Sequence, residues 1–173
     1  QLQPAGKVYD SVARVSQEVA GKLAAGLRQH TQGEVLFSAA DCGRYATDAS
    51  IYQETPVGVF VPQSVDEVAT ALDLCRDLSV PIVARGGGTS QCGQTVNRAL
   101  VIDCSKHLRR VLSVDAEAGT AIVEPGAVLG QVNGALRRHG MFFAVDPSTH
   151  ARCTIGGMAG NNSCGSKSIR YGL

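Results

Sequence analysis

Three consecutive glycines, Gly86 to Gly88, stand between a short apolar run and two hydroxyl residues, Thr89 and Ser90. Without Cβ atoms in the way, several backbone N–H groups of such a loop can converge on one anion. The two hydroxyls add donors, and Arg85 can offset negative charge. We therefore expect a phosphate-binding loop. The alternative is a turn that only permits tight packing.

Two nucleotide-loop patterns fit this segment incompletely. The dinucleotide pattern GxGxxG matches Gly86 and Gly88 but meets Gln91 at the third glycine position. The Walker A pattern matches Gly88 and Gly93 but has Gln94 in place of the lysine that reaches the outer phosphates. The residues that follow lead into a β-rich run instead of a helix, so an NTPase is disfavoured.

A second glycine cluster lies near the end of the chain. Four of the 20 glycines fall between residues 156 and 165, and another four fall between 86 and 93. Two such loops would suit a ligand with two phosphates and flat rings, which describes an extended dinucleotide. The alternative for the second cluster is a disordered tail, although Ile155, Met158 and Ile169 could anchor it.

A strand, a helix and a second strand lead into the first glycine loop. Residues 57–61 are β-rich, and Ser64 with Glu67 forms a capping box that opens a helix. The helix must end before Pro81, and residues 82–84 form the next strand. This order predicts a right-handed βαβ unit with a parallel pair, whose carboxyl ends carry ligand-binding loops. The predicted buried face of the helix carries Val65, Val68, Leu72 and Cys75.

Further elements are expected between the two glycine loops. A strand, a hairpin and a helix are predicted at residues 99–102, at 110–114 with 120–123, and at 127–139. Gly140 supplies the helix stop. Residues 146–173 have little periodicity and many Gly, Ser, Thr and Asn residues, so we expect a second long binding loop.

The N-terminal third is less regular. An apolar stripe at steps of three and four predicts an amphipathic helix that runs to about Arg28. The stripe consists of Val8, Val12, Val15, Val19 and Leu23. Residues 38–56 break any period and indicate a long loop, with room for one short turn. We therefore place an N-terminal helix and loop at residues 1–55 and a binding domain at residues 56–173.

Length and charge exclude several classes of protein. A chain of 173 residues can bury roughly 70% of its unfolded surface and needs no disulfide staple. Its formal net charge of +1 leaves no large field to attract nucleic acid or an anionic membrane. No apolar stretch approaches the roughly 20 residues that span a bilayer. The first residues lack a secretory pattern, so a cytoplasmic protein is expected, although a processed start would look the same.

The cysteine spacing argues against a metal or redox site. The six cysteines are Cys42, Cys75, Cys92, Cys104, Cys153 and Cys164. No two are closer than 11 residues, so no CxxC pair exists for zinc, an iron–sulfur cluster or a redox dithiol. We expect reduced, mostly buried thiols and no metal site.

The spaced motifs together resemble the FAD-binding domain of the vanillyl-alcohol oxidase and p-cresol methylhydroxylase superfamily. Within it, they are most similar to bacterial FAD-linked dehydrogenases of the D-lactate and glycolate type. The resemblance covers residues 41–172. Its segments are residues 44–50, 81–90, 101–103, 124–126, 146–148, 154–157 and 171–172. It implies an α+β fold of the PCMH type, with a small parallel βαβ subdomain followed by part of a mixed or antiparallel sheet subdomain.

The resemblance also implies which residues hold FAD. Amides of the first loop would hold the pyrophosphate, and the second loop would line the flavin and its ribityl-phosphate side. The first set is Arg85, Gly86, Gly87, Gly88, Thr89, Ser90 and Gly93. The second set is Pro147, Ser148, Thr154, Gly156, Gly157, Asn162 and Gly165. Covalent relatives often place a histidine at the position of Thr89, and a hydroxyl cannot form that bond, so non-covalent FAD is expected.

The implied activity is an FAD-dependent oxidoreductase that removes a hydride from a small 2-hydroxy acid such as D-lactate or glycolate. In the family a separate cap domain supplies the substrate-binding and proton-abstracting groups, so we assign no catalytic residue. An iron–sulfur domain or subunit is the expected electron acceptor, and the full-length protein could be peripheral to the inner membrane. The alternative is a non-catalytic nucleotide-binding or scaffold module.

The sequence stops at Leu173 within a family segment. We therefore expect the N-terminal part of the flavin domain, incomplete at its C-terminus. Such a fragment would be inactive alone, and its exposed apolar face would favour self-association.

Overall fold

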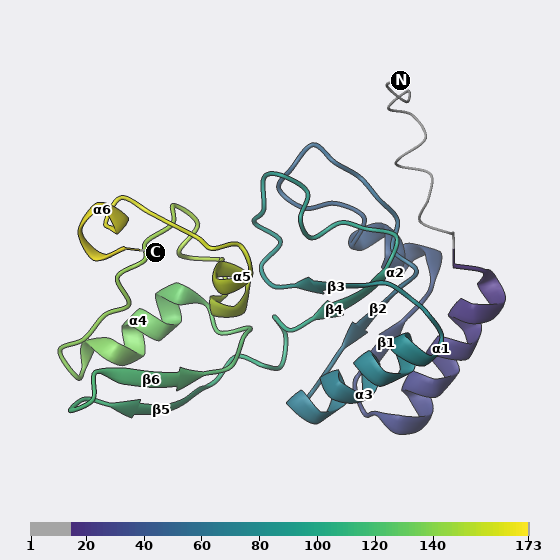
Figure 1. The fold of residues 1–173 in the computed structure, drawn as a ribbon, viewed down its shortest axis with the longest axis horizontal. Coiled ribbons are helices and arrows are strands. Elements are labelled where there is room, and N and C mark those ends of the chain that lie inside the picture. Colours follow the sequence, from purple (N-terminus) through teal and green to yellow (C-terminus); the bar gives the residue numbers. More distant parts are fainter. Residues whose placement is uncertain (1–14, 173) are drawn as a thin grey trace, which may run out of the picture.

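A computed structural model describes residues 15–172. Figure 1 shows two groups of elements side by side, one built on a four-stranded sheet and the other on a hairpin. The first group contains α1 (Gln17–His30), β1 (Glu34–Leu36), α2 (Ala39–Arg44), β2 (Gly58–Val61), α3 (Val65–Asp77), β3 (Ile82–Arg85) and β4 (Leu100–Asp103). The second contains β5 (Val111–Asp115), β6 (Thr120–Val123), α4 (Leu129–Arg137), α5 (Ile155–Gly160) and α6 (Ser168–Tyr171).

The four-stranded sheet has the order β1-β2-β4-β3. β4 pairs in parallel with both β2 and β3, and β1 is antiparallel to β2. The predicted strands and the connecting helix are confirmed, but the predicted parallel pairing of β2 with β3 is wrong. β4 lies between them because all four of its residues are buried, as are those of β2, and such strands need neighbours on both sides.

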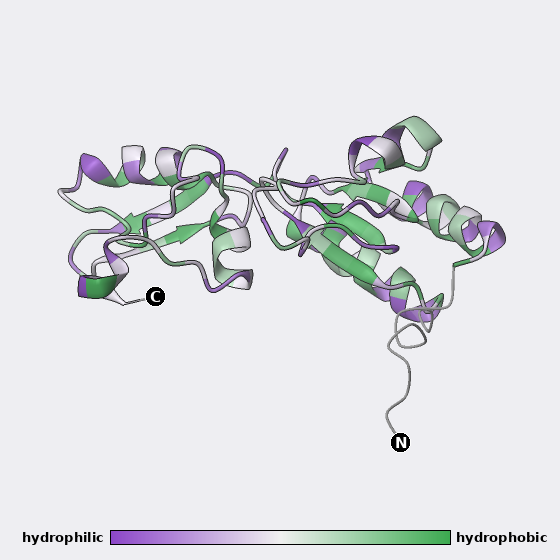
Figure 2. Ribbon diagram, turned by 90° about the horizontal axis from the view of Figure 1, so that it is seen from above, coloured by the Kyte–Doolittle hydropathy of each residue, from purple (hydrophilic) through white to green (hydrophobic). Residues whose placement is uncertain are grey.

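Both faces of this sheet are covered. On one face, α1 and α3 pack against Phe60, Leu100 and Ile102. On the other face, Val59, Val61 and Val101 form a separate cluster with Tyr45. In Figure 2 the central strands are the most hydrophobic part of this group. The sheet is therefore packed on both faces, and its strand ends can carry loops.

The capping box that opens α3 is confirmed in part. The Ser64 side chain accepts a hydrogen bond from the Glu67 amide at 3.3 Å. The Glu67 carboxylate instead accepts from the amides of Gln32 and Gln63, which ties the start of α3 to the chain after α1. The predicted buried face is confirmed in part: Cys75 is fully buried and Val68 packs on the core, whereas Val65 and Leu72 are exposed and Ala71, which was not predicted, is fully buried. Contact with α1 decides this orientation.

The N-terminal third contains more structure than the sequence indicated. Residues 34–36 add an edge strand, and the expected loop at 38–56 includes α2. α2 begins at Ser38, whose side chain accepts a hydrogen bond from the Asp41 amide at 3.1 Å. Val15, Val19 and Leu23 of the predicted stripe pack on the core, and Val8 and Val12 lie outside the described residues. The division at residues 55 and 56 remains a proposal.

The second group begins with the hairpin of β5 and β6, which the sequence predicted. The predicted helix is α4, whose Val132 and Leu136 are buried against the hairpin side. The final segment is not a continuous loop, because it contains the short helices α5 and α6. Met158 anchors α5 in a small core with Leu129 and Val145. The expected α+β class is confirmed.

All six cysteines are free thiols, as expected. Cys92 and Cys164 are exposed, Cys104 is partly buried, and the other three are buried. Among residues 15–172, no helix is both long enough and apolar enough to cross a bilayer.

Candidate functional site

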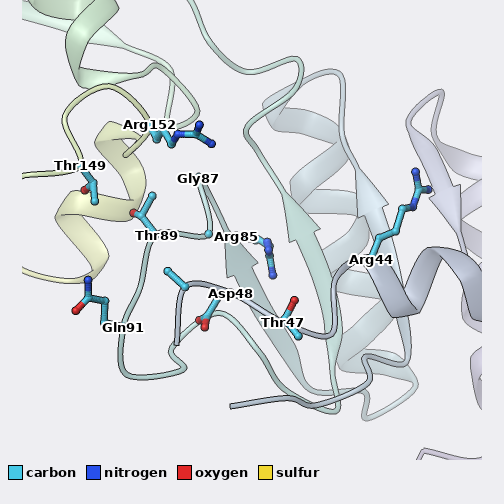
Figure 3. Close-up of a pocket in the computed structure, with 11 residues that line it drawn as sticks. Arg44, Thr47, Asp48, Arg85, Gly87, Thr89, Gln91, Thr149 and Arg152 are labelled. Carbon is cyan, nitrogen blue, oxygen red and sulfur yellow. The ribbon is translucent and has the colours of Figure 1, made fainter. Parts of the chain in front are cut away.

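A pocket of about 410 Å³ opens where the first glycine loop meets two other segments (Figure 3). Its walls come from the segment after α2, the loop after β3, and the turn before α5. The lining residues are Arg44, Thr47, Asp48, Ala49, Arg85, Gly87, Gly88, Thr89, Gln91, Thr149 and Arg152. Three regions distant in the sequence therefore form one cavity at the carboxyl end of β3.

The first glycine loop offers backbone donors to this pocket. None of the amides of residues 86–91 donates a hydrogen bond to the part of the chain that the structure describes. Gly88 has φ +63°, a left-handed conformation that a glycine adopts without steric cost. Such a run of unused amides beside a cavity is suited to bind an anion.

The second glycine loop packs directly behind the first. A Cβ at Gly86 would overlap Oγ1 of Thr154, and a Cβ at Gly87 would overlap the carbonyl oxygen of Arg152. Thr154 is 2% exposed, and its hydroxyl caps α5 by accepting from the Gly157 amide. Farther along, Gln94 Nε2 donates to Asn161 Oδ1 at 2.9 Å. The glycines at 86 and 87 therefore permit close approach of the two loops.

The segment after α2 forms the third wall. The Ala49 amide donates to the Gly88 carbonyl at 3.1 Å. Asp48 accepts from the Thr95 hydroxyl at 2.9 Å and from the Ser50 amide at 2.8 Å. Partial burial raises the pKa of Asp48, but these hydrogen bonds outweigh it and lower the pKa overall. Asp48 therefore stays ionised and fixes this wall against the first loop.

Arginines dominate the charge of the pocket. Arg44 is paired with Asp41 at 2.5 Å. Arg85 and Arg152 make no ion pair within residues 15–172. Against them the lining holds one carboxylate, Asp48. Two guanidinium groups together with free amides fit a doubly charged diphosphate, because charge-assisted hydrogen bonds to phosphate are among the strongest in proteins.

The structure brings together part of the predicted site. Arg85, Gly87, Gly88 and Thr89 line the pocket. Gly86 and Thr154 lie immediately behind it, where they hold the two loops together.

The other predicted residues lie outside the pocket lining. Gly93, with φ +76°, approaches the ring of Tyr52, while Gly156 packs on Pro125 and Gly165 on Asp146. The Pro147 carbonyl accepts from the His150 amide, so Pro147 and Ser148 belong to the turn that precedes Thr149. Ser90, Gly157 and Asn162 are also outside this lining.

Sequence reasoning missed several lining residues. Residues 44–50 were noted for their resemblance to a family segment but were not assigned to the site. Thr149 and Arg152 were overlooked, although they stand between the Pro-Ser segment and Thr154. An arginine so close to a glycine cluster was the available signal. Among the described residues, no group of three metal-ligating side chains comes together.

Comparison with known proteins agrees with this geometry. The FAD binding domain family matches residues 56–173, so the chain belongs to that family of FAD-binding domains. Its cofactor is therefore FAD. Among solved structures, an alkyldihydroxyacetonephosphate synthase aligns with a TM-score of 0.79 and 21% identity over 88% of this chain and 34% of that one. A p-cresol methylhydroxylase aligns with a TM-score of 0.66 and 18% identity, covering 84% and 30%. The PCMH-type fold is thus confirmed.

The curated relatives include a dehydrogenase and an oxidase subunit. D-2-hydroxyglutarate dehydrogenase of Haemophilus influenzae is 34% identical over 83% of this chain and 14% of its own length. Glycolate oxidase subunit GlcD of Bacillus subtilis is 37% identical over 82% of this chain and 31% of its own length. The chain therefore spans about a seventh to a third of the length of these relatives.

Proposed function

We propose that the pocket holds the diphosphate of FAD. The observation that carries this proposal is a loop of unused amides, residues 86–91, whose members Gly87, Gly88, Thr89 and Gln91 line the same cavity as Arg85 and Arg152. In this arrangement Gly87, Gly88 and Thr89 supply backbone donors, and the two guanidinium groups balance the charge. Pro147, Ser148, Gly156, Gly157, Asn162 and Gly165 are proposed to lie along the flavin side, with Ser90 and Gly93 beside the first loop.

We further propose that the full-length protein is a flavin-dependent dehydrogenase or oxidase acting on a 2-hydroxy acid. The names of the relatives support this proposal, since both 2-hydroxyglutarate and glycolate are 2-hydroxy acids. When bound, FAD would supply the acceptor for the hydride. The residues of this chain would bind and orient the cofactor.

Two further features of the full-length protein are proposals. An iron–sulfur domain or subunit would take electrons from the flavin, and the protein would be cytoplasmic, with or without peripheral attachment to the inner membrane. Self-association through exposed apolar side chains is proposed for the isolated chain, because Leu112, Ile122, Phe142 and Phe143 are all exposed in the second group.

Reconstitution of the full-length protein with FAD tests the activity. A yellow protein whose visible band bleaches on anaerobic addition of D-2-hydroxyglutarate, glycolate or D-lactate is the expected result. A colourless protein after FAD addition would contradict the cofactor site. A yellow protein that no 2-hydroxy acid bleaches would contradict the substrate class only.

Arg152 offers a test of the site itself. We expect Arg152→Ala to weaken FAD binding by about tenfold or more, because hydrogen bonds to charged groups contribute about 1.5–3 kcal/mol. The matched control is Arg28→Ala at the end of α1, where the arginine is exposed and distant from the pocket lining. Equal FAD affinity in both variants would remove Arg152 from the proposed site.

A further inference from the structure

Arg85 lies between an aromatic ring and the first glycine loop. Its Cζ atom is 5.2 Å from the centroid of the Tyr45 ring, a cation–π distance, and its Nη1 lies 3.4 Å from the Tyr45 carbonyl oxygen. On the loop side, a Cβ at Gly88 would come within 2.8 Å of Nη2. The guanidinium group is therefore confined on two sides while it lines the pocket.

The Tyr45 ring is itself held in place. Its hydroxyl donates a hydrogen bond of 2.7 Å to Oδ2 of Asp103, and the other carboxylate oxygen accepts from the Ser105 amide at 2.7 Å. Asp103 is 6% exposed and stands beside Arg85 in the pairing of β4 with β3. Burial, and next the hydrogen bond to Asp103, raises the pKa of Tyr45 above its usual range, so the hydroxyl remains a donor.

The contacts of Tyr45 with Asp103 and with Arg85 join three parts of the fold. Asp103 ends β4, Arg85 ends β3, and Tyr45 is the C-terminal cap of α2. Long arginine side chains lose much rotamer entropy when a ligand fixes them. A guanidinium group that the protein has already oriented pays less of that entropy on binding, so its contact contributes more to affinity.

We propose that Tyr45 and Asp103 are positioning residues that hold the Arg85 guanidinium against the first glycine loop, ready for the diphosphate. This inference rests on the proposed cofactor site. Neither Tyr45 nor Asp103 lines the pocket, so both act through Arg85. Their effect on binding must therefore disappear when Arg85 is absent.

A double-mutant cycle in the full-length protein tests this dependence. Tyr45→Phe keeps the ring and removes only the hydroxyl, and Tyr45→Leu removes the ring as well. We expect Tyr45→Phe to weaken FAD binding about threefold to tenfold and Tyr45→Leu to weaken it further. In the Arg85→Gln background, both changes should alter the FAD dissociation constant by less than about twofold, because coupled residues are not additive.

ADP serves as a second probe, because it carries the diphosphate without the flavin. We expect Tyr45→Phe to weaken ADP and FAD binding by the same factor. The control is Tyr171→Phe, which removes a hydroxyl from an exposed ring in α6 and should leave both dissociation constants unchanged. Far-ultraviolet circular dichroism of every variant ensures that folded proteins are compared.

Three results would overturn the inference. An equal loss from Tyr45→Phe with and without Arg85 would make Tyr45 an independent structural residue. Unchanged affinity in Tyr45→Phe and Tyr45→Leu would show that Arg85 needs no positioning. A wild-type protein that binds neither FAD nor ADP would reject the proposed cofactor site and this inference with it, whereas additive losses in an FAD-binding protein reject the inference alone.

Discussion

Gly86 packs directly against the Thr154 side chain, so closely that any Cβ at residue 86 would overlap the Thr154 hydroxyl oxygen. Each belongs to a different glycine loop, and the same hydroxyl caps α5. The two loops are thus joined by a glycine that leaves room and a buried threonine that fills it. The shape of the pocket depends on this contact as well as on the residues that line it.

A double-mutant cycle at these two residues measures the contact. Gly86→Ala should destabilise the protein by about 1–3 kcal/mol through overpacking, and Thr154→Ala by about 0.5–2 kcal/mol through loss of the cap. Because Thr154→Ala removes the overlapping oxygen, the double variant should cost less than the sum of the two. Urea unfolding provides the free energies of unfolding. If the double variant loses as much free energy of unfolding as the two single variants together, within about 0.5 kcal/mol, the contact is contradicted.

Gly87→Ala should lower FAD affinity in the full-length protein. The new Cβ would overlap the Arg152 carbonyl oxygen, so the loop must shift, at a local cost of about 1 kcal/mol or more. Helix content should not change. Gly134→Ala is the matched control, because nothing lies within 4 Å of that position in α4 and alanine favours helix. Unaltered flavin occupancy in Gly87→Ala would indicate that the loop is only a turn.

Acid denaturation should release all of the flavin into the soluble fraction. The family resemblance described above places Thr89 where covalent members carry a histidine, and a hydroxyl cannot form that bond. The measurement is the flavin absorbance of the supernatant after precipitation of the full-length holoprotein. Flavin that remains with the precipitate would mean attachment at another residue, for which His150 and Cys153 are the candidates to examine by peptide mapping.

Glu124 should make the fold sensitive to acid. Its carboxylate is 5% exposed. It accepts hydrogen bonds from the side chain of Arg110 and, with a smaller effect, from the Arg110 amide, and these hydrogen bonds lower the pKa of Glu124 in the folded state. Because the pKa of Glu124 is lower in the folded state than in the unfolded state, its ionised carboxylate stabilises the fold. This stabilisation is fully present at pH values above the unfolded pKa of about 4.3, and it is lost as the pH falls through the folded pKa.

The comparison between wild type and Glu124→Gln isolates this effect from the other carboxylates. We expect wild type to lose more of its free energy of unfolding than the variant between pH 6 and pH 3. Urea unfolding at each pH measures the difference. Parallel pH profiles would show that Glu124 titrates alike in the folded and unfolded states.

Local signals in the sequence predicted the elements well. The Ser64 cap, the β-rich run before it, the hairpin and α4 all depend on residues near one another in the chain, so a short window contains the necessary information. The two glycine loops were found for the same reason. Their shared composition predicted a common ligand, but their direct contact was not predicted.

Features that depend on distant partners were missed. The insertion of β4 between β2 and β3, the edge strand β1 and the buried face of α3 are all decided by packing between separate elements. Arg152 was overlooked because an arginine in a polar segment is most often solvated, and its closeness to the glycine cluster was not used. It is the proximity of Gly87 that brings this residue to the pocket.

The strand order also determines when the sheet can form during synthesis of the chain. β2 and β3 leave the ribosome before β4, yet they do not pair with each other, and β4 is the strand that joins them. Until residues 100–103 emerge, two apolar strands expose unpaired edges that could associate with other chains. A translational pause before β4 emerges from the ribosome would prolong that exposure, whereas a pause after β4 has emerged would let the sheet close.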